Sequence, residues 1–345
     1  MNSNSIYDLT RADLSTICET AGYQTYKVRQ LLSWLYKKKE TSLAQMSDLG
    51  KNYSAFLQGQ FSFSQLKIVK QQVSADKTIK FLLACEDGQM VETVVMRHSY
   101  GNSVCVSSQV GCLMGCRFCA SGLLKKVRNL TVGEMVLQVL QAEVEIQQRI
   151  DNVVVMGSGE PFDNFENVLK FLAIINDDWS LAIGARHITV STCGLVPQII
   201  DFATQPAYNL AISFHGATND LRDYLMPINK KYDLNCLKKA LLEYQKLKNR
   251  RISLEYILLN GVNDKERDIV AIKEFIKGID NVYLNLIPYN SVVECGFKGV
   301  SEVAALKFYN LLKKANIAVT LRNKRGEDID AACGQLRNRV AQGDC

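Results

Sequence analysis

Residues 105–119 read CVSSQVGCLMGCRFC, and this stretch decides how the rest of the chain is interpreted. A β-rich apolar run passes into a glycine-containing loop that carries Cys112, Cys116 and Cys119 at C-x3-C-x2-C spacing. The spacing predicts that three thiolates converge at the end of a strand. Iron–sulfur clusters usually take four cysteine ligands, so a three-cysteine loop leaves one iron open to a substrate or cofactor. The alternatives are a zinc site or incidental cysteines, although zinc ligands usually come as two separated pairs.

From about residue 98 the sequence alternates between strand-like and helical segments. Six β-rich apolar runs lie near residues 102–107, 152–157, 187–192, 208–214, 251–258 and 282–287. A capping-box signature at Thr131 and Glu134 predicts the start of one intervening helix. Alternating strands and helices predict an α/β fold with a parallel sheet, and six units favour a partial (βα)6 barrel, although an open sheet has the same pattern. In both folds the carboxyl ends of the strands carry the chemistry.

The first hundred residues have a different pattern. Apolar positions at helical spacing, such as Val28, Leu31 and Leu35, predict a small helical accessory domain over residues 1–65. Alternating residues on either side of a turn at Glu86, Asp87 and Gly88 predict a connecting β-hairpin within residues 66–97. Residues 98–345 are then the barrel with a C-terminal tail.

The composition indicates a folded chain: 47% of the 345 residues are hydrophobic and 22% are charged. Apolar runs reach only about five residues, against roughly 20 for a membrane span, and the N-terminus does not read as a secretory signal. We therefore expect a cytoplasmic protein without a membrane partner. Eleven cysteines in that reducing compartment argue against a disulfide framework. The net charge of +6 is compatible with nucleic-acid binding but does not require it.

The cysteine loop, with Phe118 before the last cysteine, resembles the signature of the radical S-adenosylmethionine superfamily. The resemblance implies a 4Fe-4S cluster bound by Cys112, Cys116 and Cys119. It also implies that S-adenosylmethionine binds the open iron and is cleaved, by an electron from the reduced cluster, to methionine and a 5'-deoxyadenosyl radical.

Further motifs follow the later strands. They are MGSGEP at 156–161, Ser191, SFH at 213–215, Asn290 and the tail RGEDIDAACGQL at 325–336. A glycine-rich strand end lets a ligand approach the backbone, although each motif alone could be an ordinary turn. Together, from about Glu92 to Leu336, they resemble the RlmN/Cfr class of radical S-adenosylmethionine RNA methyltransferases. Ser158 replaces the methionine more often seen at its position.

This resemblance implies roles for particular residues. Cys333 would be the methyl-accepting cysteine, Cys105 the second redox cysteine and Glu92 the proton acceptor. A buried structural thiol is the alternative for each cysteine, and a solvated strand residue for the glutamate. The positions that would bind S-adenosylmethionine are Gly159, Glu160, Ser191, Ser213, Phe214, His215 and Asn290.

The class methylates adenine in RNA and uses two S-adenosylmethionine molecules per turnover. The resemblance implies that one would methylate Cys333 and the other would supply the radical, after which a Cys105–Cys333 disulfide would have to be reduced. Pro161, Pro288 and Arg325 resemble the RlmN branch, which methylates C2 of an adenine in the peptidyl transferase region of 23S rRNA and of an adenine in tRNA. The alternatives are the C8-directed Cfr branch and a non-catalytic iron–sulfur protein that binds RNA or senses redox state.

The expected partners are therefore 23S rRNA, tRNA and a reducing electron donor such as a flavodoxin system. We expect the protein itself to be a monomer. Basic and aromatic residues alternate in 26–30 and 34–39, which suits phosphate contact and base stacking, although a solvated amphipathic helix has the same pattern. Further candidates for RNA contact on the barrel rim are Lys125, Lys126, Arg128, Lys230 and Lys231.

Overall fold

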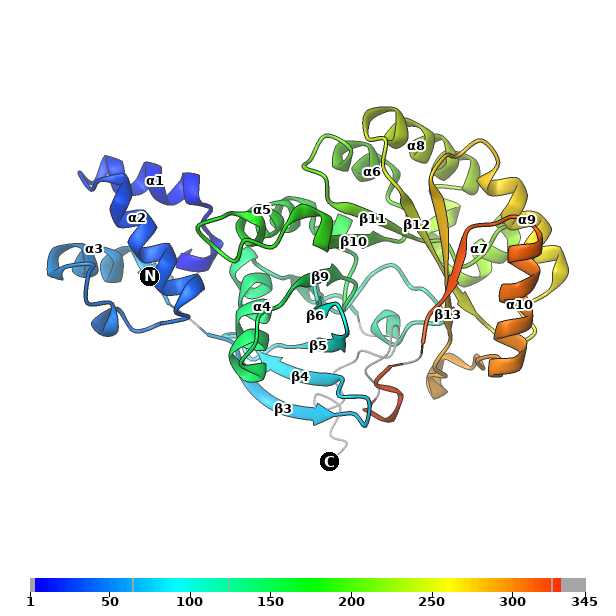
Figure 1. The fold of residues 1–345 in the computed structure, drawn as a ribbon, viewed down its shortest axis with the longest axis horizontal. Helices are drawn as coiled ribbons and strands as arrows, with labels where there is room; N and C mark the ends of the chain where they lie inside the picture. Colours follow the sequence, from blue (N-terminus) through cyan, green and yellow to red (C-terminus); the bar gives the residue numbers. More distant parts are fainter. Residues whose placement is uncertain (1–3, 64, 124, 324, 330–345) are drawn as a thin grey trace.

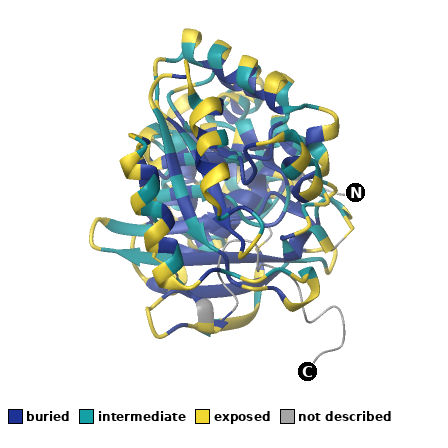
Figure 2. Ribbon diagram, turned by 90° about the vertical axis from the view of Figure 1, so that its right-hand side faces the viewer, coloured by how far each residue is buried: buried dark blue, intermediate teal, exposed yellow. Residues whose placement is uncertain are grey.

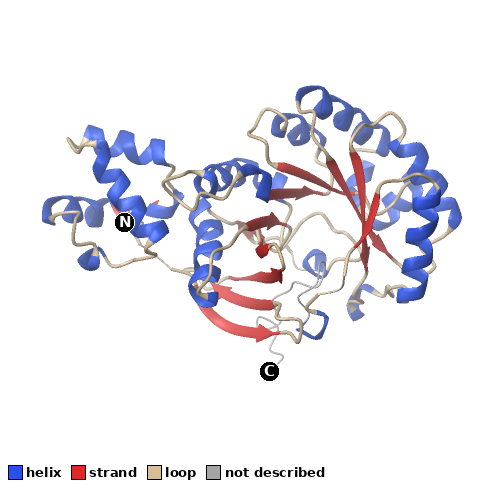
Figure 3. Cartoon of the chain, viewed as in Figure 1, coloured by secondary structure: helices blue, strands red, loops and turns tan. Residues whose placement is uncertain are grey.

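The computed structural model describes residues 4–63, 65–123, 125–323 and 325–329. These residues form a twisted sheet of ten strands in the order β14-β13-β12-β11-β10-β9-β6-β5-β4-β3 (Figures 1 and 3). The parallel strands are β6 (Gly101–Val106), β9 (Asn152–Val155), β10 (Ile188–Thr192), β11 (Asn209–Ser213), β12 (Ile252–Leu258), β13 (Val282–Pro288) and β14 (Val319–Leu321). All six predicted strands form, and the partial barrel is confirmed.

Helices cover the outer face of the parallel strands (Figure 1). They are α4 (Val132–Ile146), α5 (Phe165–Asn176), α6 (Val196–Phe202), α7 (Asn219–Leu225), α8 (Leu234–Leu247), α9 (Glu266–Ile276) and α10 (Glu302–Lys314). The predicted capping box begins α4, because the Glu134 amide donates to Thr131 Oγ1 at 3.2 Å and the Thr131 amide donates to Glu134 Oε2 at 2.9 Å. The strands beneath these helices are mostly buried (Figure 2). Alternate strand residues such as Leu254 and Tyr256 are fully buried.

The predicted hairpin forms from β4 (Ile79–Ala84) and β5 (Met90–His98), and β5 pairs antiparallel with β6. The hairpin thus extends the barrel sheet. The structure adds β3 (Lys67–Val73) at the outer edge, which the hydrophobic pattern did not predict. Its residues, KIVKQQV, are mostly exposed and polar, as is common where an edge strand must not recruit another chain.

The N-terminal residues fold into α1 (Arg11–Thr20), α2 (Thr25–Leu32) and α3 (Lys51–Gln60), as predicted. This helical unit lies on one side of the barrel and contacts α4 (Figure 1). Asp8 accepts a hydrogen bond of 2.6 Å from the amide of Gly133, in the first turn of that helix, and Lys39 pairs with Glu143 at 3.0 Å. The domain boundaries at residues 65 and 97 stay a prediction. Among the described helices, none is both long and apolar enough to cross a membrane.

Hydrogen bonds converge on Ser107, where β6 ends and the cysteine loop approaches. Gln138 of α4 accepts from the Ser107 amide at 2.8 Å and donates to the Ser107 carbonyl at 3.0 Å. The Ser107 hydroxyl donates to the Glu92 carbonyl of β5 at 2.6 Å and accepts from the Ser158 amide at 3.0 Å. This cluster of bonds, which we call the Ser107 junction, fixes three segments that carry predicted site residues.

We predict that Gln138→Leu lowers the free energy of unfolding by about 3 kcal/mol. The substitution keeps the side-chain volume but leaves the Ser107 amide and carbonyl buried without a partner, at roughly 1–3 kcal/mol for each group. Urea unfolding measures this change. The matched control is Gln141→Leu on the same helix, where the side chain reaches only the exposed Glu145. Equal losses in the two variants would contradict a special role for the Ser107 junction.

Candidate active site

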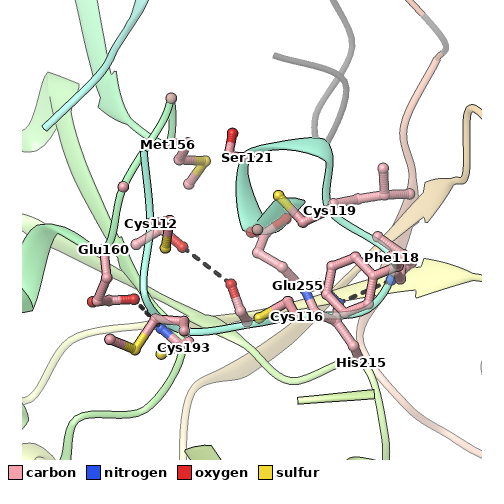
Figure 4. A pocket seen from close by; sticks show the side chains of 18 of the residues that line it. Cys112, Cys116, Phe118, Cys119, Ser121, Met156, Glu160, Cys193, His215 and Glu255 are labelled. Carbon is pink, nitrogen blue, oxygen red and sulfur yellow. Dashed lines mark hydrogen bonds between the residues drawn. The ribbon is translucent and has the colours of Figure 1, made fainter. Parts of the chain in front are cut away.

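The three cysteines of the loop line one cavity inside the barrel (Figure 4). The loop is fixed on both sides: the Arg117 amide donates to the Leu225 carbonyl at 3.0 Å, and the Tyr289 hydroxyl donates to the Phe118 carbonyl at 2.8 Å. Phe118 itself is buried, so it packs the loop against the barrel. The structure therefore brings the predicted ligands together at the carboxyl end of β6.

The electrostatics of these thiols fit an iron–sulfur cluster. Burial raises the pKa of Cys112 to about 12 and that of Cys116 well above its usual value, and nearby thiolates add to both shifts. Bound iron cations would offset the free-energy cost of ionising these buried thiols. Among the described residues no three His, Cys, Asp or Glu side chains are close enough to hold one metal ion. A zinc ion needs its ligands around a single point, whereas the thiolates of a 4Fe-4S cluster bind different irons.

The glycine-rich turn after β9 packs directly on the residues that lead into the cysteine loop. Gly159 has φ +107°, and a Cβ there would lie 2.6 Å from Cβ of Gln109, so only glycine fits. The amides of Ser108 and Gln109 both donate to the Ser158 carbonyl, at 2.9 and 3.1 Å. The Ser158 hydroxyl lies 3.1 Å from that of Ser121, and a serine at this position is therefore accommodated.

Glu160 joins two of the strand-end loops. Its carboxylate accepts from the Cys193 amide at 2.7 Å and from the Phe162 amide at 3.0 Å, and burial raises its pKa against the effect of these bonds. No motif in the sequence assigned a role to Cys193. It is buried, and it also lines the cavity, where burial and the Glu160 charge raise the pKa of its thiol.

The remaining predicted cofactor positions divide into two groups. Ser191, Ser213 and His215 line the cavity, and the two serine hydroxyls are 3.5 Å apart. Phe214 points to the opposite face of the sheet, with its ring 4.5 Å from that of Phe275. Asn290 is buried beyond the cavity lining, and its amide oxygen has no hydrogen-bond partner, an orphaned acceptor that fits a donor group on a ligand.

His215 is held as a neutral imidazole. Its Nδ1 accepts from the Ile257 amide at 3.2 Å, so the proton belongs on Nε2. Burial, aided by the charge of Arg222, lowers its pKa to about 3. The residue has φ +52°, and its ring meets Phe118 edge-on at 4.8 Å.

Arg222 of α7 was missed by sequence reasoning because no spacing pattern distinguishes it from a helix arginine that lies on the surface. Its guanidinium is fully buried and donates to the carbonyls of Cys193 at 2.6 Å and Ser213 at 3.3 Å. It thereby holds the ends of β10 and β11 around the cavity. Residues that line the cavity and that no motif indicated include Glu255 and Arg322.

Glu92 and Cys105 lie on neighbouring strands away from the cysteine loop. The Glu92 carboxylate is buried and lies 3.2 Å from Lys80 Nζ, so the interpretation as a solvated strand residue is wrong. Cys105 packs with Val94 and Ile329, in a cluster that also includes Met156 of the cavity wall. Cys333 lies outside the described residues. No disulfide links any two cysteines that the structure describes.

A three-cysteine loop at the end of the first parallel strand of a partial barrel defines a radical S-adenosylmethionine protein. The profile of the Radical SAM superfamily matches residues 106–272, and that of the "Ribosomal RNA large subunit methyltransferase N-terminal domain" matches residues 4–62. More specifically, the chain belongs to the RlmN family of radical S-adenosylmethionine methyltransferases.

Full-length relatives carry this identification. The chain is 44% identical over 335 residues to the "Probable dual-specificity RNA methyltransferase RlmN" of Acholeplasma laidlawii, covering 97% of this chain and 99% of the relative. Its identity to the Spiroplasma citri protein of the same name is 47% over 337 residues, with coverage of 96% and 97%. The crystal structure of a radical SAM methyltransferase from Sphaerobacter thermophilus superposes with a TM-score of 0.92 at 38% identity, covering 97% and 99% of the two chains.

We predict that His215 makes the protein less stable in acid. Its pKa is about 3 when folded and 6.5 when unfolded, so below pH 6.5 the unfolded chain binds a proton that the folded chain does not. Between pH 7 and pH 4 this group alone should remove roughly 3 kcal/mol from the free energy of unfolding.

The comparison variant is His215→Asn, because the asparagine oxygen can replace Nδ1 as acceptor and asparagine tolerates a positive φ. Urea unfolding at several pH values should show a shallower acid limb in the variant. Parallel pH dependences in the two proteins would disprove the assignment of a neutral, buried His215.

Proposed function

We propose that this protein methylates C2 of an adenine in the peptidyl transferase region of 23S rRNA and of an adenine in tRNA. The cavity lined by Cys112, Cys116, Cys119 and the strand-end serines carries the proposal. Full-length relatives named dual-specificity RNA methyltransferases support the choice of RNA.

The choice of adenine C2 explains why a radical superfamily is involved. This carbon is an sp² C–H centre that is not nucleophilic, so it cannot attack the methyl group of S-adenosylmethionine directly. In the proposal, the loop cysteines hold the 4Fe-4S cluster, and Glu160, Ser191, Ser213 and Asn290 position S-adenosylmethionine. When bound, the reduced cluster would supply the electron that cleaves this cofactor.

The residues of the chain then handle the carbon and the proton. The Cys333 thiolate accepts a methyl group by displacement; this carbon would lose one hydrogen to the radical that the cleaved cofactor supplies and would then bond to adenine C2. Glu92 takes the C2 proton. Cys105 attacks the sulfur of Cys333 and breaks its bond to the transferred carbon, which takes up a proton to complete the methyl group; the methylated RNA is released and a disulfide remains for cellular reductants. Two S-adenosylmethionine molecules are used per turnover.

The position of Cys105 supports its proposed role. Cys105 packs against Ile329, and Cys333 follows four residues later in the sequence. Four residues span at most about 14 Å, so the start of the tail is anchored within reach of the proposed partner. The Lys80 ammonium lies 3.2 Å from the Glu92 carboxylate and holds it on the inner side of β5.

Contacts within the protein occupy some of the basic residues that were candidates for RNA binding. Lys27 donates to the Leu49 carbonyl at 2.8 Å, and Lys126 and Arg128 form ion pairs within the protein. Residues that stay exposed are Tyr26, Arg29, Lys37, Lys38, Lys125, Lys230 and Lys231. The proposal places these on the RNA interface of a monomeric cytoplasmic enzyme, which receives electrons from a donor such as a flavodoxin system.

Anaerobic turnover tests the function. The iron-reconstituted protein is incubated with methyl-labelled S-adenosylmethionine, reductant and protein-free 23S rRNA or tRNA, followed by nucleoside mass spectrometry. We expect 2-methyladenosine, lost in Cys112→Ala and in Cys333→Ala but retained in Cys236→Ala, whose thiol is exposed on α8. Formation of 8-methyladenosine instead would indicate the Cfr-type reaction. RNA binding without any cofactor cleavage would indicate a non-catalytic protein.

A second prediction concerns release of the product. Cys105→Ala removes the thiol that attacks Cys333, so the RNA should stay covalently attached to the protein. Denaturing gel electrophoresis with labelled RNA should show a slowly migrating protein–RNA species in this variant, with far less free methylated RNA. A variant that releases methylated RNA at the normal rate would show that Cys105 has another role.

A further inference from the structure

A row of polar side chains crosses the inner wall of the barrel and continues beyond the residues used above. Strand register pairs Ser213 with Glu255, Glu255 with Asn285, and Asn285 with Thr320. The row begins at Ser191, whose hydroxyl is 3.5 Å from that of Ser213. It therefore runs from the proposed cofactor site to the exposed edge at β14, and its central residue, Glu255, has no assigned role.

The Glu255 carboxylate is buried and held in one orientation. One oxygen, Oε1, accepts from the Ser253 hydroxyl at 2.8 Å, and the other, Oε2, accepts from the Asn285 amide at 2.9 Å. The Asn285 oxygen accepts in turn from the Thr320 hydroxyl at 3.1 Å, which fixes the direction of the amide. A carboxylate has about four lone-pair sites, so these two bonds leave acceptor capacity next to the cavity that Glu255 lines (Figure 4).

A buried carboxylate is a costly wall residue, since an apolar side chain of similar volume is often as stable or more stable. Arg322 only partly offsets this cost, because the closest approach of its guanidinium to Glu255 is 3.9 Å. Glu255 thus resembles a binding group rather than a stabilising one. Its chemistry selects neutral or cationic donors and repels phosphate.

Hydroxyl donors fit this site better than a base edge. On an adenine edge the amino donor lies beside a ring-nitrogen acceptor, which would face the carboxylate with a lone pair. A ribose offers hydroxyl donors without that repulsion, and acidic residues serve the same purpose on the ribose of dinucleotides in other folds. The neighbouring Ser213 hydroxyl adds a second polar contact of the right kind.

We propose that Glu255 binds the ribose of an adenosine, with Ser253, Asn285 and Arg322 holding its carboxylate in place. The inference rests on the proposed function, which brings two adenosines into the cavity region: that of S-adenosylmethionine and that of the target RNA. Both carry a 2'-hydroxyl, so the experiment must separate them.

The first arm measures S-adenosylhomocysteine, a non-reactive probe, and its 2'-deoxy analogue by equilibrium dialysis on the anaerobic, cluster-reconstituted protein. We expect the deoxy change and the Glu255→Gln substitution each to weaken binding about 10-fold, since hydrogen bonds to charged groups have this strength. The two changes together should weaken it no further, because they remove the same contact. Asp268→Asn, a buried carboxylate on α9 outside the cavity, is the matched control and should leave binding unchanged.

The second arm compares single-turnover methylation of RNA that carries adenosine or 2'-deoxyadenosine at the target position. If the deoxy change and Glu255→Gln give non-additive losses in this arm alone, the contact is to the target nucleoside. Non-additive losses in the first arm assign the contact to the cofactor. Independent, additive losses in both arms would overturn the proposal, as would a variant that binds both probes like the wild type.

Two further measurements keep the outcomes distinct. Glu255→Gln should unfold at the same or a higher temperature than the wild type, because it removes a buried charge; a large drop without coupling would show a structural role. Should Glu255→Gln not fold, Ser253→Ala serves instead, because it keeps the carboxylate but removes the hydroxyl that fixes Oε1. In this variant the loss of affinity caused by the 2'-deoxy change should be about threefold smaller than in the wild type. A wild-type protein that neither binds S-adenosylhomocysteine nor methylates RNA would refute the proposed function itself, whereas an active enzyme with additive losses would refute only the role of Glu255.

Discussion

The hydrogen bonds of the Ser107 junction are the constraint on which the site depends. A strand end cannot bond to a further sheet neighbour, so its polar groups need other partners. Gln138 supplies them from α4, and the Ser107 hydroxyl connects β5 with the turn after β9. One serine therefore sets the spacing among the strand that bears Glu92, the approach to the cysteine loop and the glycine-rich turn.

The barrel separates two environments across the thickness of one sheet. Outward-facing residues such as Leu254 and Tyr256 pack under helices and provide the stability. The inner wall instead carries charges with individual partners: Glu160 bonds to backbone amides, and Glu255 bonds to Ser253 and Asn285. The buried Arg222 of α7 adds a positive charge that bonds to strand-end carbonyls. Such groups are expensive to bury, and their concentration around one cavity is what marks it as a site.

Helix α4 links the N-terminal unit to this cavity. Its Gly133 amide donates to Asp8 of that unit and its Glu143 pairs with Lys39. Gln138 lies between these two contacts on the same helix. An RNA held by the N-terminal helices would therefore be positioned relative to the catalytic loops by a single rigid element. This arrangement gives the accessory unit a structural reason to pack where it does.

The sequence by itself determined the fold class, all the parallel strands described except β14, the α4 cap and the cysteine loop. These features depend on local periodicity, on capping chemistry between neighbouring residues and on spacing within one loop, all of which are present in the chain before it folds. The sequence did not reveal β3, because an exposed edge strand has no apolar alternation, and it did not reveal that Glu92 is buried beside Lys80.

Only the tertiary structure decided which side chains share the cavity. Cys193 and Glu255 come from segments that lie far apart in sequence and meet because parallel strands bring their carboxyl ends to one side of the sheet. Arg222 of α7 then joins two of these strand ends through their carbonyls. The tertiary structure also showed that Phe214 faces the helices while its neighbours Ser213 and His215 face the cavity. Register and burial settle such assignments, and both depend on partners that no local pattern encodes.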